Sequence, residues 1–218
     1  MKILVFDDNK THRIAAHAQL KDHDLTVVGT YDEVQKLLTP QFNFEKAKAI
    51  LREKFPDFNP YLSDDEAKNA EYFAAKKLAD KQATTYPDFD VVLSDLIVPA
   101  SRQKQGSMEL VGMEMPVGIF IGLLAAVKAR AKFVAVFTDS DHHSHPASAC
   151  FDVFNEGENE PTPFMIESSK VLLSNTRNWV NQFDPNDLGK KLEYEDYSKR
   201  SDTVRAKNWR ALLEYLVS

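Results

Sequence analysis

Acidic side chains end two of the apolar segments of this chain, and a hydroxyl ends a third. Asp7 and Asp8 directly follow the letters ILVF, Asp95 ends the segment FDVVLSD, and Thr138 ends the segment KFVAVFT. Short apolar runs of this kind are typical of strands that are buried on both faces of a parallel sheet. The three carboxylates and the hydroxyl at these strand ends are therefore the first candidates for chemistry.

These residue types suit the binding of a cation and a phosphoryl group. Carboxylates gathered at one edge of a sheet repel one another unless a cation neutralises them, and an all-oxygen set of ligands favours Mg²⁺. The segment PFMIESSKVLL is predicted as a further strand with Lys170 near its end. The hydroxyl of Thr138 and the ammonium of Lys170 are groups that would bind phosphoryl oxygens opposite the carboxylates. The pattern predicts a centre that forms an aspartyl phosphate.

The segments between these residues alternate between strand and helix. Residues 9–23 and 31–38 have apolar positions at helical spacing, and the letters LTVVG between them are predicted as a strand. Another apolar helix, VGIFIGLLAAVKARA, precedes the run that ends on Thr138. This alternation predicts an α/β fold with a doubly wound parallel sheet of five strands. Because ligands bind outside the carboxyl ends of such strands, we expect the polar strand ends to converge.

The length of the chain is explained by insertions into one domain that spans residues 1–218. Residues 40–88 have alternating charge and few β-branched residues, and we expect a helical hairpin there. Residues 101–117 are expected to form a polar, methionine-rich loop beside the site. We expect a helix at residues 175–183, and an amphipathic helix at residues 202–216 that offers a surface for a homodimer.

The order of these segments resembles the receiver domain of bacterial two-component response regulators. The matching pieces are ILVFDDN, VVLSDLIVP, the glycine Gly118 that opens the next helix, VAVFTDS and IESSK. The resemblance implies a flavodoxin-like or receiver-like fold in which Asp95 is the phosphoacceptor. It also implies that Asp8 binds Mg²⁺ directly, that Asp7 binds it largely through water, and that the main-chain carbonyl of Ile97 completes the protein ligands.

The resemblance further implies a signalling role and its partners. Thr138 would donate a hydrogen bond to the phosphoryl group, and Lys170 would pair with its oxygens. The phosphoryl group would come from a histidine kinase or a phosphotransfer protein, and the signal would pass to a downstream protein partner. A stand-alone receiver of this kind has at most slow self-dephosphorylation, so we expect a phosphoacceptor and not an enzyme with turnover.

Composition and charge argue against nucleic acids and membranes as partners. The net charge of −6 argues against a general nucleic-acid or anionic-membrane surface, and no DNA-reading helix follows the receiver-like segments. The longest apolar stretch, residues 117–127, is shorter than the roughly 20 residues that a membrane span requires. Cys150 is the only cysteine, which favours a reducing compartment. We therefore expect a cytoplasmic protein.

Three positions depart from the receiver pattern and favour an alternative function. Asp139 follows Thr138 where the family has a small residue, and its charge would oppose an incoming phosphoryl group. Val171 follows Lys170 in place of the family's proline, and Glu167 stands where the family has an aromatic switch residue. These residues favour a pseudo-receiver, an adaptor that binds partners without phosphorylation.

A histidine cluster raises a third possibility. His142, His143 and His145 lie beside Asp139 and Asp141 directly after the third strand end. Imidazole and carboxylate groups could hold Zn²⁺, which would suit a metal-dependent phosphohydrolase. A short histidine run without i, i+4 spacing is more often a solvated loop, and we keep this function behind the other two.

Overall fold

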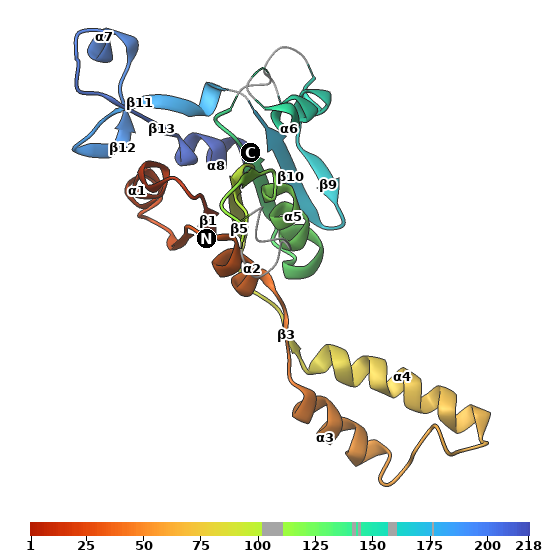
Figure 1. Cartoon of the computed structure of the whole chain (residues 1–218). Coiled ribbons are helices and arrows are strands. Elements are labelled where there is room, and N and C mark those ends of the chain that lie inside the picture. The colour runs from red at the N-terminus through yellow and green to blue at the C-terminus, as the bar shows by residue number, and fades with distance from the viewer. Residues whose placement is uncertain (102–110, 141–142, 144, 157–160, 176) are drawn as a thin grey trace. The chain divides into compact units, whose positions relative to one another are not determined.

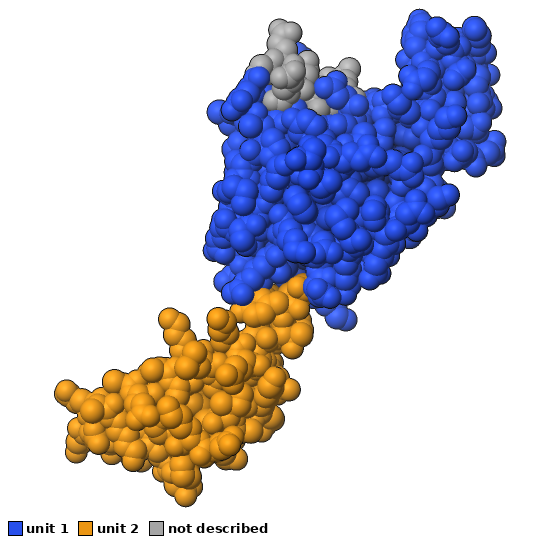
Figure 2. Space-filling model, turned by 180° about the vertical axis from the view of Figure 1, so that it is seen from behind, with its two compact units in different colours: residues 1–38, 88–218 blue, residues 39–87 orange. Residues whose placement is uncertain are grey.

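The computed structural model describes residues 1–101, 111–140, 143, 145–156, 161–175 and 177–218. The central part of the loop expected at residues 101–117, and also His142, lie outside the described residues. The chain forms two compact units, coloured separately in Figure 2: unit 1 is residues 1–38 and 88–218, and unit 2 is residues 39–87. None of the helices in the described part of the chain combines the length and apolar character that a membrane span needs.

Unit 1 is an α/β structure built on a six-stranded, mostly parallel sheet (Figure 1). Its strands lie side by side in the order β2 (Asp24–Val28), β1 (Lys2–Phe6), β5 (Val91–Asp95), β8 (Phe133–Phe137), β10 (Ser169–Ser174) and β9 (Phe164–Ile166). The first five are parallel, and β9 pairs with β10 in antiparallel orientation. The prediction of five strands is wrong by one because the expected single strand at residues 163–173 is a hairpin. Glu167, at the turn, has a left-handed φ of 52°.

Helices cover both faces of this sheet. Successive residues of β1 point to opposite faces, so Ile3 and Val5 pack in one apolar core while Leu4 and Phe6 pack in the other. The first core also takes side chains from α1 (Lys10–Gln19) and α8 (Trp209–Val217). The second takes them from α2 (Tyr31–Leu38) and from α5 (Gly118–Leu123), which continues as the π-helical segment η2 (Leu124–Ala129). Burial on both faces explains the nearly continuous apolar sequence of the central strands.

The connection that follows β1 is short and fixed by a helix cap. The side chain of Asn9 accepts a hydrogen bond from the backbone N–H of Thr11 at 2.9 Å and so caps α1. The backbone N–H of Asp7 donates to the carbonyl of Val28 at 3.2 Å and prolongs the pairing of β1 with β2. Asp7 and Asp8 are therefore held between the last residue of a buried strand and the first turn of a helix.

The residues after β10 form a second, antiparallel sheet that the sequence did not predict. Its strands lie in the order β12 (Asp187–Lys191), β11 (Val180–Asp184) and β13 (Val204–Lys207), with α7 (Tyr194–Tyr197) between β12 and β13 and η4 (Arg177–Trp179) before β11. The helix expected at residues 175–183 is wrong. The helix expected at residues 202–216 begins later, because Asn208 accepts from the backbone N–H of Ala211 at 3.1 Å and caps α8.

Unit 2 is a helical hairpin closed at its base by two short strands. Its elements are β3 (Gln41–Phe42), α3 (Phe44–Lys54), α4 (Glu66–Gln82) and β4 (Thr84–Thr85), and β3 pairs with β4. Asn43 and Asp65 cap the two helices, accepting from the backbone N–H groups of Lys46 and Lys68. The other short elements belong to unit 1: β6 (Val98–Pro99), β7 (Glu114–Met115), α6 (Pro146–Ala149) and η3 (Cys150–Phe154).

Candidate functional site

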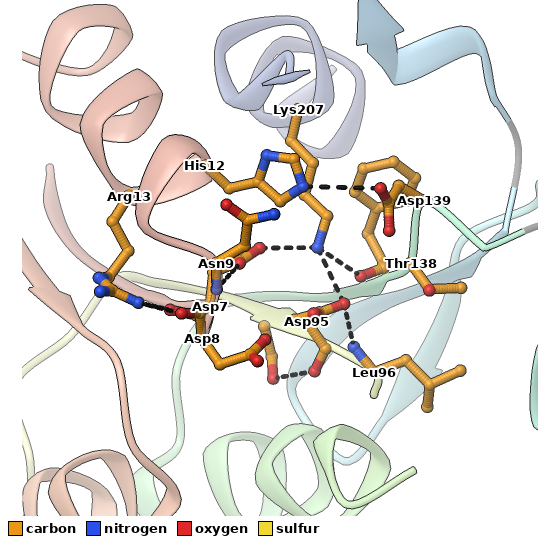
Figure 3. A network of polar contacts seen from close by, with 12 residues as sticks. Asp7, Asp8, Asn9, His12, Arg13, Asp95, Leu96, Thr138, Asp139 and Lys207 are labelled. Atoms are coloured by element: carbon orange, nitrogen blue, oxygen red, sulfur yellow. Dashed lines mark hydrogen bonds and ion pairs between the residues drawn. The ribbon is translucent and has the colours of Figure 1, made fainter. Parts of the chain in front are cut away.

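Three carboxylates meet at the carboxyl ends of the neighbouring strands β1 and β5. Asp7 and Asp8 follow β1, and Asp95 is the last residue of β5. One carboxylate oxygen from each lies within 4.8 Å of the others (Figure 3). Asp7 is fully buried, Asp95 is 6% exposed, and Asp8 is only partly buried. The cluster of Asp7, Asp8 and Asp95, called the acidic cluster below, could hold a metal ion.

The cation that faces this cluster is Lys207, the last residue of β13. Its Nζ lies 2.7 Å from Oδ2 of Asp7 and 2.8 Å from Oδ1 of Asp95 (Figure 3). The side chain of Lys207 is fully buried. Its Nζ also lies 5.3 Å from the ring centroids of both Phe137 and Trp209, which is within range of cation–π attraction. The site therefore contains a buried ammonium bound to two carboxylates.

Lys170, the lysine predicted for this role, lies at the opposite end of the sheet. It pairs with Phe133, the first residue of β8, whereas Asp95 pairs with Phe137, the last residue of β8. The strand expected at residues 163–173 begins earlier than β10, so Lys170 lies near the start of the observed strand and not near its end. Val171 and Glu167 differ from family positions that are defined by their distance from the site lysine. Because Lys170 is not that lysine, these two differences say nothing about the site.

Helix α1 holds Lys207 in place through the backbone. The side-chain amide of Gln19 donates to the carbonyl of Lys207 and to that of Leu188, each at 3.1 Å. The indole N–H of Trp209, two residues after Lys207, donates to the carbonyl of His12 at 2.9 Å. Because α1 also follows Asp7 and Asp8 directly, one helix positions the two acids and the lysine that faces them.

The sequence did contain a signal for Lys207. The letters TVRAK alternate between apolar and polar residues, which is typical of a strand, and Asn208 is a preferred N-cap residue. A helix that begins after Asn208 leaves Lys207 at a strand end. The helix expected at residues 202–216 covers this strand, whereas the helical spacing begins only at residue 209.

Thr138 follows β8, the strand next to β5, and is buried. Its Oγ1 accepts a hydrogen bond from the backbone N–H of Ser140 at 3.1 Å, and its own backbone N–H donates to the carbonyl of Ser174 at 3.1 Å. The hydroxyl proton is not used by the contact with Ser140. Phe137, the residue before Thr138, pairs with Asp95, and its carbonyl accepts from Nζ of Lys207 at 3.5 Å, so Thr138 follows the same edge of the sheet (Figure 3).

Asp139 adds a further charge beside Thr138. Its Oδ2 lies 3.6 Å from Nε2 of the buried His12. The contact with His12, together with the charge of Lys207, lowers the pKa of Asp139 to about 2 despite partial burial. Asp139 is therefore ionised throughout the neutral range.

Burial and mutual repulsion shift the pKa values of the acidic cluster. Burial raises the pKa of Asp95 to about 7, and the charges of Asp7 and Asp8 add to this effect, although Lys207 opposes it. Burial and the charge of Asp7 also raise the pKa of Asp8. Burial alone would lower the pKa of Lys207, but Asp7 and Asp95 raise it above its usual range. A further positive charge at the cluster would favour ionisation of Asp95 and Asp8.

Comparison with other proteins adds nothing to this geometry. No family model, curated protein or solved structure matches the chain.

The three carboxylates differ in how far their oxygens are already engaged. Asp7 accepts from the backbone N–H of Asn9 at 2.9 Å through Oδ1 and from Lys207 through Oδ2. Asp95 uses Oδ1 for Lys207 and for the backbone N–H of Leu96 at 2.8 Å. Arg13 fixes the backbone of Asp7 and Asp8 by donating to both carbonyls. The partly exposed Asp8 carboxylate is the best placed of the three to bind a cation directly.

The histidine cluster does not join the acidic cluster in the described part of the chain. His145 caps α6, since its Nδ1 accepts from the backbone N–H of Ala147 at 3.1 Å. The metal-competent group found among the described residues contains acids and no histidine. The geometry of His145 gives no support to the hydrolase hypothesis.

Proposed function

We propose that the chain is a stand-alone, atypical response-regulator receiver in which Asp95 accepts a phosphoryl group with the help of Mg²⁺. The donor is a histidine kinase or a phosphotransfer protein, and the output passes through protein contacts. The observation on which this proposal rests is the buried Lys207, which joins Asp7 to Asp95 and contacts the carbonyl of Phe137, the residue before Thr138. A lysine and a threonine hydroxyl near a nucleophilic carboxylate could stabilise the charge on the oxygens of a phosphoryl group.

The strand order supports a flavodoxin-like, receiver-type sheet. Numbered along the chain, the parallel strands β2-β1-β5-β8-β10 have the order 2-1-3-4-5. In sheets of this order, ligands bind where the strand order reverses, between the first and third strands. Those strands are β1 and β5, which are the two that place Asp7, Asp8 and Asp95. The acidic cluster lies at the position where such a fold binds its ligand.

The proposed reaction is a phosphoryl transfer between two side chains. A carboxylate oxygen of Asp95 attacks the phosphorus of a phosphohistidine, the new O–P bond forms, and the N–P bond to the donor imidazole breaks. The imidazole leaves with the electron pair of that bond and takes up a proton. Lys207 stabilises the developing charge on the phosphoryl oxygens, and the hydroxyl of Thr138 donates a hydrogen bond to one of them.

The donor set of the cluster fits Mg²⁺. Asp8 would bind the ion directly, with Asp95 and the carbonyl of Ile97, two residues beyond it, as the other protein ligands. Asp7, whose oxygens already accept from Asn9 and Lys207, would act through water. When bound, the ion supplies positive charge to the phosphoryl oxygens.

Phosphorylation at Asp95 gives the most direct test. Intact-protein mass spectrometry after incubation with acetyl phosphate and Mg²⁺ is expected to detect one phosphoryl adduct on the wild type. Asp95→Asn is expected to give none, because the amide cannot act as the nucleophile. Asp88→Asn, which alters a carboxylate with a 94% exposed side chain, should leave the adduct intact.

The failure of this experiment has a definite meaning. A folded wild-type protein that forms no adduct with any donor supports the phosphorylation-independent adaptor instead. One observation favours that second function: the ionised Asp139 places a negative charge next to Thr138, where it opposes an incoming phosphoryl group.

The raised pKa of Asp95 predicts how Mg²⁺ binding depends on pH. Since the ion binds the ionised carboxylate, protons compete with it below the pKa of about 7. The apparent affinity for Mg²⁺ is expected to fall by about tenfold per pH unit below that value and to level off above it. Titrations followed by tryptophan fluorescence would measure this, since Trp209 packs against Lys207. An affinity that does not change across this range would contradict the assignment of Asp95 as a ligand.

A further inference from the structure

Unit 2 contains an apolar groove between its two helices. Helix α3 contributes Phe44, Ala47 and Leu51, which are spaced by three or four residues and so share one helix face. Helix α4 contributes Tyr72, Lys76 and Asp80, which follow one another at intervals of four residues on the same face. The hollow between these faces, called the hairpin groove below, has a volume of about 1080 Å³.

The hairpin cannot cover this groove with its own side chains. Ala47 and Phe55 are buried at the floor, whereas Phe44 is 63% exposed and Phe42, at the same end, is 51% exposed. Two helices that pack only against each other leave part of their apolar surface exposed. Another packed element is needed to bury that surface. The groove is therefore an apolar surface without a covering element within unit 2.

The length of the groove matches a short helix. Its volume of about 1080 Å³ is at the upper end of the range of small-ligand pockets, and the exposed side chains of Phe42 and Phe44 lie at one end of it. Helix α3 has 11 residues, so its face provides a track of about 16 Å, or three helical turns. Stripes of residues one turn apart on two neighbouring helices are the surface on which an amphipathic helix docks.

The charges on the rim of the groove indicate what the docking helix must carry. On α4, Lys76 pairs with Asp80 at 3.0 Å, and their charges offset each other. On α3, Lys48 and Arg52 lie one turn apart on the groove side, and neither forms an ion pair within the described part of the chain. Asp57, near the end of α3, is the one remaining acid of the lining. The α3 rim is therefore positive.

We propose that the hairpin groove binds an amphipathic helix of a partner protein, with an apolar stripe flanked by acidic residues about one turn apart. The apolar stripe covers Leu51 and Tyr72, and the acids pair with Lys48 and Arg52. This surface is independent of the chemistry at Asp95. It gives the chain a second surface for binding a partner protein. This surface lies in unit 2, which is not part of the receiver-like segments.

A designed peptide tests the proposal on the full chain. The probe is a fluorescein-labelled amphipathic helix of about 18 residues, with a leucine stripe and glutamates beside it. A second probe carries lysine at every glutamate position. Fluorescence anisotropy is expected to show binding of the glutamate probe and at least tenfold weaker binding of the lysine probe, because opposite charges complement the α3 rim and like charges oppose it.

Variants of the rim separate the groove from the rest of the surface. Arg52→Glu is expected to lower the affinity for the glutamate probe by about tenfold and to raise the affinity for the lysine probe. Leu51→Asp should abolish both interactions by placing a charge in the apolar stripe. Lys77→Glu changes an exposed charge on α4 outside the groove and should have little effect. Circular dichroism checks that each variant keeps its helices.

Three results would overturn the proposal. Equal binding of the two probes would mean that charge does not select the occupant. Binding unaffected by Arg52→Glu and Leu51→Asp in folded protein would place the probe elsewhere. Concentration-dependent dimerisation that Arg52→Glu abolishes, measured by light scattering, would show that a second copy of the chain fills the groove.

Discussion

Lys207→Met is expected to lower the free energy of unfolding by about 3–5 kcal/mol at about pH 8 in the absence of metal ions. The substitution keeps the length of the apolar stem but leaves Asp7 and Asp95 buried without their ammonium partner. An uncompensated buried charge is costly because the low dielectric of the interior does not screen it. Urea denaturation followed by tryptophan fluorescence would measure the loss.

The pH dependence of this loss identifies its cause. Without Lys207, whose charge opposes the rise in the pKa of Asp95, that pKa should increase beyond about 7. An acid whose pKa is raised on folding binds more protons when folded than unfolded, so it favours the folded state as the pH falls between the two pKa values. The loss should therefore shrink at about pH 5. A loss of equal size at both pH values would indicate lost packing instead.

Lys170→Met is the matched control for Lys207→Met. Lys170 is partly exposed and lies at the far end of the sheet, so its replacement should change stability by less than about 0.5 kcal/mol. Lys170→Met should also retain the phosphoryl adduct, whereas Lys207→Met should lose it. A protein that loses the adduct with Lys170→Met alone would contradict the assignment of Lys207.

The second large effect is expected at Gly118, the first residue of α5. A Cβ at this position would lie 1.8 Å from the carbonyl oxygen of Asp95 and 2.7 Å from Cα of Leu96. Both are backbone atoms, so no side chain can rotate away, and the hydrogen bond from Gly118 N–H to the Leu96 carbonyl at 2.9 Å would have to break. Gly118→Ala is expected to cost about 3 kcal/mol or more in the free energy of unfolding, measured by chemical denaturation.

Gly122→Ala, one turn further along α5, provides the comparison. A Cβ there would approach Cγ2 of Val136 at 2.6 Å, and outside its own helix it would meet side-chain atoms and not backbone. Alanine also gains about 1 kcal/mol of helix propensity over glycine, which offsets part of the clash. Gly122→Ala should therefore be clearly less destabilising than Gly118→Ala. Equal losses would mean that the start of α5 can move away from Asp95.

The proximity of Asp7, Asp8 and Asp95 could be predicted from the sequence because the strands that precede them have a distinctive apolar pattern. The runs that precede Asp7 and Asp95 are apolar at nearly every position, as strands buried on both faces must be. The polar residue that ends each run then marks the carboxyl edge of the sheet. Thr138 follows the same rule, and the structure places it beside the same edge.

Lys207 could not be found by the same rule because its strand belongs to another sheet. Strand β13 has four residues that alternate between apolar and polar side chains, and it pairs with β11 in antiparallel orientation. Its short alternating pattern is readily absorbed into the helical pattern of the following residues. The lysine that resembled the family motif, Lys170, stood instead in a strongly apolar segment whose start and end were not distinguishable from sequence.

The position of Lys207 along the chain has a consequence for the order of folding. Asp7 and its ion-pair partner are separated by 200 residues, and the acids of β1 and β5 leave the ribosome long before β13. A nascent chain that has formed the parallel sheet would hold three crowded carboxylates and no buried ammonium. Until β13 pairs with β11 and docks on α1, Asp7 and Asp95 lack the ammonium that pairs with them in the folded chain. Strand β13 therefore supplies a cation that offsets part of the negative charge at this edge of the sheet.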